Sequence, residues 1–322
     1  MMGMRALVLR VCAVLLVLPL LAAAPAKAVS TFATPQAGVD ALVAALQAND
    51  PAQMEALFGA AGMSIIRSGD RVSDQTDRKE FLAAYGAQHV LNTQGDMASL
   101  SIGNDAWPFP IPLEHRAKGW SFDVAAGQEE ILARRIGANE LFTQQVLLAC
   151  VDAQNEYADG LHDGSKLHVY AQHFLSSPGK QDGLYWPTGE GEPQSPLGPL
   201  VADANAAGYH PGRGAEPQPF HGYFFKMLTA QGPDSASGAY HYIVNGAMIG
   251  GFAMVAWPAR WDHSGVMTFI VNQDGEIYQK DLGPNTADIA KAMTLFNPDV
   301  SWSKVGAPAP IPGEGSDDGT GE

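Results

Sequence analysis

The pattern of apolar and polar residues is clearest near the C-terminal end of the chain, where alternating runs flank two turn signals. Asn245-Gly246 and Asp274-Gly275 favour tight β-hairpin turns, because these residues adopt positive φ angles at little cost. Each signal therefore predicts a pair of antiparallel strands. The predicted strands are 240–244 paired with 249–257, 266–271 paired with 276–280, and an additional strand over 221–230.

Apolar residues at helical spacing predict three helices at the start of the chain. Thr34-Pro35 indicates the first helix, because threonine caps helices and proline is favoured at the first helical position. Asn49-Asp50-Pro51 ends that helix and begins the second. The apolar positions of the three helices are Val39, Leu42, Val43 and Leu46; Met54, Leu57 and Phe58; and Phe81, Leu82, Tyr85 and Val90. Strands are then expected at 98–102, 109–115 and 119–124.

A long helical pattern over 128–158 and a Pro- and Gly-rich segment over 176–219 come next. Gly137 is a candidate break in the helical pattern. A structureless connection of about 44 residues is uncommon in a compact domain unless it binds something or covers an edge. Its residues Tyr185 and Trp186 are placed to dock on the sheet, either as a lid or as a structural plug. A long helix against an antiparallel meander predicts a two-layer α+β architecture.

The first 28 residues have the pattern of a secretory signal. Arg5 and Arg10 precede an apolar run over 11–24, and Ala26-Lys27-Ala28 fits a small-x-small cleavage site. The run contains Pro19 and is shorter than the roughly 20 residues of a membrane-spanning helix. We therefore expect cleavage near Ala28, export, and no stable membrane anchor. The predicted organisation is a signal peptide over 1–28, an N-terminal domain over 29–126, a C-terminal domain over 127–304 and a disordered acidic tail over 305–322.

Charge and cysteine content limit the classes of partner. The chain has 19 basic and 34 acidic residues, and the signal contains three of the basic ones, so cleavage changes the net charge from −15 to −18. Nucleic acids and anionic membranes attract proteins largely through Lys and Arg, so neither is an expected partner. Cys150 is the one cysteine that remains after cleavage, which excludes an intramolecular disulfide. We expect Cys150 to be a small buried apolar residue of the long helix.

Two parts of the chain resemble known folds. Residues 32–125, with helices first, strands after and the ending Gly119-Trp120-Ser121-Phe122-Asp123, resemble the cone-shaped α+β domains of the nuclear-transport-factor-2-like superfamily. This resemblance implies a curved sheet whose mouth can hold a small ligand, or a catalytic carboxylate and histidine. The long helix and the segments 251–258 and 269–275 resemble the globular part of type IV pilins and pseudopilins. The second resemblance implies a pilin-like fold for the C-terminal half.

Five longer strings extend the comparison to the mature chain as a whole. They lie at 102–112, 127–137, 183–187, 221–225 and 279–283. With these strings the chain is similar to a bacterial exported family known as Domain of Unknown Function 2950. The family has no assigned activity. The resemblance therefore implies export and architecture, and it leaves the function open.

The segment Trp107-Pro108-Phe109-Pro110-Ile111-Pro112 is the first candidate site. Its alternating prolines remove three backbone donors, so we expect it on an edge or at the surface of a sheet. One interpretation is an aromatic groove, and the other is a rigid edge strand whose prolines prevent pairing with other chains. The candidate ligand-binding residues of the groove are Asp105, Trp107, Phe109, His115 and Trp120.

The other polar residues show no established catalytic or metal-binding pattern. His162, His168 and His173 are six and five residues apart, whereas a separation of four places two imidazoles on one helix face. No Gly-x-Ser-x-Gly turn is present, and Glu129-Glu130 fits the acidic first turn of a helix. We therefore expect no metal site and no cofactor. Candidate residues of a partner-binding surface are Tyr185, Trp186, His221, Tyr223 and His241.

These observations favour an exported protein, periplasmic or secreted, that acts as a binding or assembly component with another envelope protein as its partner. They do not favour catalysis. Two alternatives stay open: a small-molecule-binding protein or enzyme with a pocket in the N-terminal domain, and a pilin-like filament accessory. A deep polar cavity with two ionisable groups in contact would favour the first. An exposed sheet edge or a large apolar patch would favour the filament accessory, which uses its sheet as a docking surface, over the enzyme.

Overall fold

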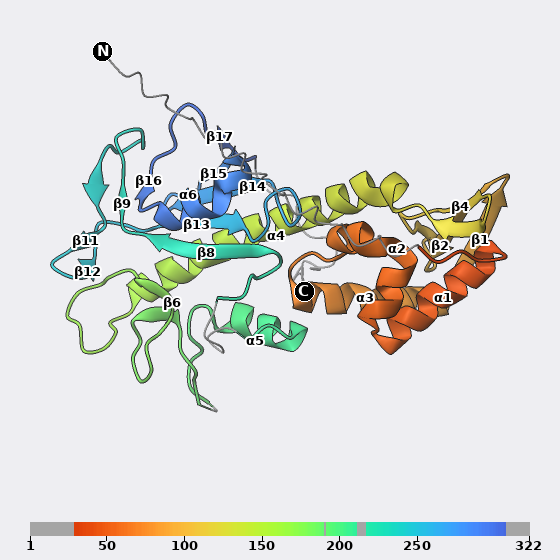
Figure 1. The fold of residues 1–322 in the computed structure, drawn as a ribbon. Helices are drawn as coiled ribbons and strands as arrows, with labels where there is room; N and C mark the ends of the chain where they lie inside the picture. Colours follow the sequence, from red (N-terminus) through yellow and green to blue (C-terminus); the bar gives the residue numbers. More distant parts are fainter. Residues whose placement is uncertain (1–28, 190, 211–216, 307–322) are drawn as a thin grey trace, which may run out of the picture.

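The computed structural model describes residues 29–189, 191–210 and 217–306 of the chain (Figure 1). The predicted signal peptide and residues 307–322 of the predicted tail lie outside the described residues. Helices and antiparallel strands occur in both halves, so the predicted α+β class is confirmed. Within the described ranges, no helix is both long enough and apolar enough to cross a membrane.

Three helices form the first layer of the N-terminal domain, close to their predicted positions. Each begins at a polar residue, Thr34, Asp50 or Asp70, whose side chain accepts hydrogen bonds from the amides of the first turn. Such a cap is worth about 1 kcal/mol, because those amides have no partner within the helix. The helices are α1 (Pro35–Ala48), α2 (Pro51–Ile66) and α3 (Arg71–Ala87).

A five-stranded antiparallel sheet packs against these helices. Its strand order is β1-β2-β4-β5, and β3 pairs with the last residues of β2. Leu100, Leu113 and Phe122 of the sheet join Val39 and Leu42 of α1 in a buried core. The strands are β1 (His89–Gln94), β2 (Met97–Ile102), β3 (Trp107–Pro108), β4 (Leu113–Arg116) and β5 (Gly119–Phe122).

Two predictions for this region are wrong. Val90 belongs to β1 and not to the third helix, because α3 ends at Ala87. The predicted strand over 109–115 is absent as a continuous element, and the chain forms the short strands β3 and β4 instead. Pro110 and Pro112 lack the N–H groups that a continuous strand would donate, which explains the interruption.

One helix, α4 (Val124–Asp159), runs through both halves of the molecule (Figure 1). The helix is continuous at Gly137, so the candidate break there is wrong. The first part of α4 packs against α2, and the last part packs against the C-terminal sheet. Cys150 is buried in the core of the C-terminal half as expected, and this burial raises the pKa of its thiol to about 12. Because α4 is shared, the predicted domain boundary at 126/127 falls within its first turn.

The C-terminal half is built around a second five-stranded antiparallel sheet. The Asp274-Gly275 hairpin is confirmed, with Val271 opposite Ile277 and a φ of 73° at Gly275. Every residue of the central strand β13 is buried between α4 and the remaining segments. The strands in spatial order are β17 (Ser303–Lys304), β15 (Ile277–Asp281), β14 (Met267–Asn272), β13 (Ala253–Pro258) and β8 (Tyr223–Leu228).

The turn at Asn245-Gly246 forms, but its predicted strands do not pair with each other. Both residues have positive φ, 50° and 82°, and they join only β11 (Ile243–Val244) to β12 (Ala247–Met248). At Gly250 an added Cβ would lie 2.7 Å from the carbonyl oxygen of His241, so this close approach of the two backbones requires glycine. The segment predicted to complete the hairpin becomes β13 and pairs with β8 and β14. β10 (Tyr240–His241) pairs with β9 (Ala230–Gln231), which also pairs with β16 (Leu295–Phe296).

The Pro- and Gly-rich segment 176–219 is more structured than predicted. It contains β7 (Gly183–Tyr185) and α5 (Gly198–Ala207). β7 pairs in parallel with β6 (His173–Leu175), and Leu184 is fully buried in the C-terminal core. Apolar residues of the segment therefore contribute to the core. The remaining elements are the short 3₁₀-helix η1 (Gly283–Asn285) and α6 (Thr286–Ala292).

Candidate functional site

The residues predicted to bind a ligand lie at two ends of the N-terminal sheet. Trp107 pairs with Ile102 at the last residue of β2. His115 donates its backbone N–H to the carbonyl of Asp96, which precedes the first residue of β2. A strand rises about 3.3 Å per residue, so the two positions are roughly 20 Å apart. The structure therefore does not bring the predicted residues together in one groove.

Each predicted residue makes contacts that define its local role. Trp107 is 43% exposed, and the guanidinium of Arg134 lies 4.6 Å from the centre of its indole ring. Phe109 packs with its ring 5.4 Å from that of Phe81, inside the N-terminal core. Asp105 is exposed in the turn before β3. These three residues do not share a contact that would mark a binding pocket.

His115 and Trp120 are the two candidates that do meet. They lie opposite each other on β4 and β5, with ring centres 5.1 Å apart. Trp120 is buried, and Nδ1 of His115 lies 3.5 Å from a carboxylate oxygen of Asp96. The pair is a cross-strand contact at the margin of the core. Ligand binding by these candidates stays a prediction.

The predicted partner surface is divided among three environments. Tyr223 is fully buried and belongs to the C-terminal core, so its inclusion in an exposed surface is wrong. Tyr185 and Trp186 are half-buried and pack against the same core, which supports a structural plug over a lid. His241 is exposed on β10. The fifth residue, His221, lies where the two halves of the molecule meet.

A buried carboxylate, Asp70, is the centre of this junction between the halves. One oxygen, Oδ1, accepts the amide hydrogen bonds of Val72 and Ser73 and so caps α3. The other, Oδ2, accepts bonds from the hydroxyl of Tyr209 at 2.8 Å and the backbone N–H of Gly222 at 3.1 Å. Asp70 is only 3% exposed. It therefore joins the N-terminal helices to two segments of the C-terminal half.

The C-terminal side of the junction is a two-residue turn. His221 and Gly222 have φ angles of 46° and 76°, and Phe220 and Tyr223 exchange both of their backbone hydrogen bonds across them. The imidazole of His221 lies 3.8 Å from the ring of Phe142 in α4 and also contacts Tyr209 and Phe220. Burial lowers the pKa of His221, and the nearby Asp70 opposes this shift. A neutral imidazole therefore completes an aromatic cluster behind the turn.

Two arginines add links from α4 and from the C-terminal sheet to the end of α2. Arg135 donates to the carbonyl oxygens of Ile65 and Ile66 at 2.8 and 2.7 Å. Arg260, in the loop after β13, donates to the carbonyl of Arg67 at 3.2 Å. Cations at a helix C-terminus favourably oppose the helix dipole. These bonds fix the end of α2 against both α4 and the C-terminal half.

Acidic side chains of α3 surround the junction on its N-terminal side. The pKa of Asp77 is raised to about 6, mainly by desolvation and then by the negative charges of Asp74 and Glu80, although more than a third of the residue is exposed. Arg135 partly opposes this shift. The side chain of Asp74 is hydrogen-bonded within the N-terminal half, because its Oδ1 accepts bonds from the amide and hydroxyl of Ser68. The folded protein therefore disfavours the charged form of Asp77.

Replacing Asp77 by asparagine is expected to raise the melting temperature near neutral pH. The carboxyl has a higher pKa in the folded protein than its ordinary value of 3.8, so the folded form binds the proton more tightly and stability rises as pH falls from about 6 to 4. The amide of the variant does not titrate, so Asp77→Asn should differ most from the parent at about pH 7.5 and least at about pH 4. Melting curves across this range test it, with Glu55→Gln on α2 as an exposed control. If the melting temperatures of Asp77→Asn and the parent differ by the same amount at all pH values, the pKa of Asp77 is not raised.

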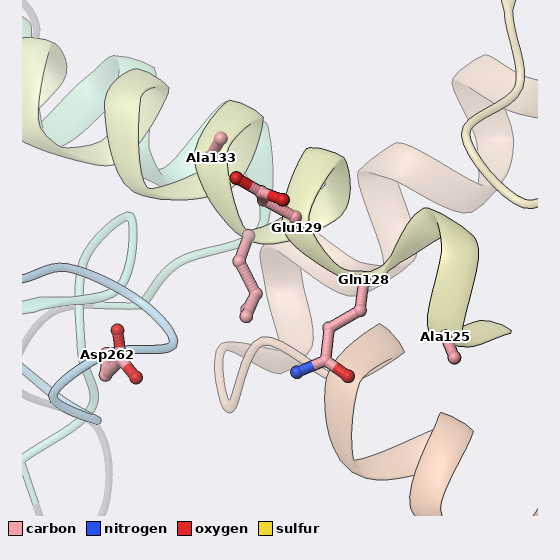
Figure 2. A pocket seen from close by; sticks show the side chains of 6 residues that line it. Ala125, Gln128, Glu129, Ala133 and Asp262 are labelled. Carbon is pink, nitrogen blue, oxygen red and sulfur yellow. The ribbon is translucent and has the colours of Figure 1, made fainter.

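An open hollow of about 420 Å³ lies between α4 and the loop after β13 (Figure 2). Gln128 and Glu129 project from α4 in different directions, and Asp262 stands across from them on the loop (Figure 2). Asp262 has a φ of 61°, and its amide donates to the carbonyl of Gly265. Two exposed carboxylates would favour a cationic group over an anion here. The other lining residues are Ala125, Leu132 and Ala133.

The junction was only partly visible in the sequence. Asp70 is recognisable as a helix cap, and His221-Gly222 as a dipeptide that can form a tight turn. Their contact with each other has no local signal, because it joins positions 152 residues apart. In the part of the chain that the structure describes, no three His, Cys, Asp or Glu side chains are grouped so that they can hold a metal ion.

The fold and junction define a protein of two α+β halves that are joined through one continuous helix. Residues 29–305 match the family described as "Protein of unknown function (DUF2950)", and the chain belongs to this family. The family resemblance predicted from the sequence strings is thereby confirmed. No curated protein and no solved structure matches the chain. The family description names no activity, so any function has to be argued from the surfaces and contacts of this chain.

Proposed function

We propose that the protein is exported and acts in the periplasm or outside the cell as a binding or assembly component without catalysis of its own. The signal pattern of the first 28 residues supports export. The junction supports a non-catalytic role, because Asp70 and Tyr209 are already engaged with each other and with the backbone. The surface on which the proposal rests is the outer edge of the N-terminal sheet.

The strand β1 is an edge strand that nothing in the described residues covers. The opposite edge of the sheet is covered by the chain itself, since Phe32 exchanges two backbone hydrogen bonds with Trp120 of β5. β1 has no such partner on its outer side. It contains no proline and no Asp, Glu, Lys or Arg, the residues that natural edge strands use to prevent pairing. This uncovered edge is the single observation that carries the proposal.

The hydrogen-bonding groups of this edge follow from the register of β1 on β2. Gly103 donates to the carbonyl of Gln88, and hydrogen-bonded pairs alternate along an antiparallel ladder. The even-numbered residues of β1 therefore bond to β2. The backbone N–H and C=O groups that point outward belong to His89, Leu91 and Thr93. A partner in extended conformation can add a strand at this edge, which is a common way for proteins to bind peptides.

The side chains beside the edge suit protein contact. Val90 is 53% exposed and Met97 is 41% exposed, and the alternation of β1 and β2 places both on the face opposite the buried residues Leu100 and Ile102. This outer face therefore combines apolar side chains with neutral polar ones such as Asn92. A polypeptide fits such a surface better than a nucleic acid or an anionic membrane does.

Site-specific cross-linking in cells tests the proposal. A photoreactive amino acid at Val90 is expected to give a defined protein adduct, whereas the same group at the fully exposed Val300, near β17, is the matched control. The adduct should disappear when Thr93 is replaced by proline, because that change removes one outward N–H. Equal adducts at both positions, or none at Val90, would contradict binding at this edge.

Export is tested separately by N-terminal sequencing of the protein from the periplasm or medium. The mature chain should begin at Val29. Full-length chain with Met1, recovered only from the cytosol, would refute export and leave the cross-linking result to be interpreted as a cytosolic interaction.

A further inference from the structure

We propose that the β1 edge pairs with the β1 edge of a second copy of this chain, so that two N-terminal sheets join across a two-fold axis at Leu91. This inference rests on the proposed function and names the partner at the same edge. The result would be a continuous antiparallel sheet through both copies. Pairing of this kind leaves no unpaired backbone ladder at the β1 edge of either protomer.

The register of the pair follows from the outward groups. In an antiparallel pair centred on Leu91, Leu91 lies opposite its own copy and His89 lies opposite Thr93. These are the residues whose N–H and C=O groups point away from β2. About six backbone hydrogen bonds form, since each hydrogen-bonded pair exchanges two. No outward group of the strand is left without a partner, which is the condition for a self-complementary interface.

The side chains are compatible with the same register. Val90 of one copy lies directly opposite Asn92 of the other, on the exposed outer face. Leu91 is partly buried against the N-terminal core, and its copy would extend that apolar layer. Because β1 carries no Asp, Glu, Lys or Arg, no like charges face each other along the edge. If the register of the pair shifted by one residue, the outward N–H and C=O groups of the two strands would no longer lie opposite each other. Such a register is therefore disfavoured.

The position of β1 in the molecule leaves room for a second copy. β1 lies at the end of the N-terminal domain that is remote from the C-terminal sheet (Figure 1). The two acidic C-terminal halves are then held far from the paired edges. Each mature chain nevertheless has a formal net charge of −18, so long-range repulsion opposes association at low ionic strength. Added salt should therefore strengthen the dimer.

The expected affinity is modest. A single pair of six-residue strands buries less surface than the roughly 1,200–2,000 Å² of a standard stable interface. We therefore expect a dissociation constant on the order of micromolar and a monomer–dimer equilibrium that depends on concentration. Sedimentation equilibrium of the mature chain, residues 29–322, measures this equilibrium from about 1 to 100 µM.

Thr93→Pro is the main variant, because it removes an outward N–H and leaves the bonds between β1 and β2 intact. Edge strands tolerate proline where the N–H faces solvent. The variant should keep the melting temperature of the parent and weaken dimerisation at least about tenfold. Asn92→Pro is the matched control, since it breaks a bond to β2 and should lower the melting temperature. A folded Thr93→Pro chain that dimerises as well as the parent would overturn the proposal.

Engineered cysteines test the register directly. Val90→Cys and Asn92→Cys proteins should form a disulfide when mixed, because the two positions are a directly opposed pair with closely spaced Cβ atoms. Each variant alone should react poorly, because identical positions are diagonal neighbours roughly 7–8 Å apart. The native Cys150 is buried and does not compete. Equal cross-linking in the mixture and in the single variants would refute the register.

The two experiments together distinguish self-pairing of β1 from binding of a different protein at the same edge. If the parent stays monomeric at about 100 µM while Val90 still cross-links to a different protein in cells, the self-pairing is refuted and the binding role stands. If the adduct at Val90 has the mass of two chains, both are supported. If the parent is monomeric and Val90 gives no adduct, both are refuted.

Discussion

Replacing Asp70 by alanine is expected to lower the free energy of unfolding by about 2–4 kcal/mol and the melting temperature by roughly 5–15 °C. The carboxylate accepts four hydrogen bonds, two from the first turn of α3 and two from Tyr209 and Gly222 across the junction. Alanine would leave these donors without an acceptor in a site that is almost fully buried. The loss should appear in both thermal and urea unfolding.

Asp50→Ala is the matched control for this prediction. Asp50 caps α2 through the amides of Ala52 and Gln53, as Asp70 caps α3, but it makes no bond to the C-terminal half. Its replacement should cost only about 1 kcal/mol. Tyr209→Phe, which removes one donor and keeps the carboxylate, should fall between the two. If Asp70→Ala costs no more than Asp50→Ala, the contacts across the junction contribute nothing to stability.

Local signals predicted the starts of α1 and α2 well because the cause of these two boundaries is local. Thr34 and Asp50 both precede proline, and their caps depend on residues two or three positions away. The Asp274-Gly275 hairpin was predicted for the same reason, since its strands are adjacent in sequence. At the Asn245-Gly246 turn the local signal predicts the turn but not the pairing of the strands. The turn forms, but β13 has better partners in β8 and β14 than in the neighbouring segment.

The strand β1 and the junction could not be predicted, for different physical reasons. β1 exposes five of its six residues, so it lacks the alternation of apolar and polar residues that identifies a half-buried strand. Its position as an edge strand, paired only with β2 among the described strands, follows from the tertiary fold. The junction has local parts, the Asp70 cap and the His221-Gly222 turn, but only the tertiary fold brings them together.

The candidate site was predicted by residue type more than by position. The sequence placed Trp107 and His115 in one groove because both are near a proline-rich segment. The register of β2 separates them, since Trp107 lies at its end and His115 at its start. Tyr223 is one of the surface candidates. The sequence pattern of β8 is compatible with an aromatic side chain on either face of the strand. The full burial of Tyr223 depends on distant contacts that no pattern in β8 reports: its hydroxyl donates to the carbonyl of Met267, and its ring lies 6.0 Å from that of Phe269.

Replacing Gly127 by alanine is expected to destabilise the protein by about 1–3 kcal/mol, although alanine normally stabilises a helix by up to about 1 kcal/mol over glycine. Gly127 lies in the first turn of α4, where an added Cβ would be 2.5 Å from the carbonyl oxygen of Pro110 and 3.1 Å from Cα of Ile111. These are backbone atoms of the segment between β3 and β4. They cannot move aside without disturbing the buried Ile111.

Gly137→Ala in the same helix is the control, because an added Cβ there has no neighbour within 4 Å. It should raise the free energy of unfolding by up to about 1 kcal/mol, so the two substitutions are expected to have opposite signs in urea unfolding. If both substitutions stabilise the protein, α4 does not pack closely against the carbonyl of Pro110. Opposite signs would give the proline-rich segment a role that neither sequence interpretation included. Its rigid backbone would then be the surface against which the first turn of α4 packs. Because α4 continues into the C-terminal half, this contact would also help to set how the N-terminal sheet is oriented relative to that half.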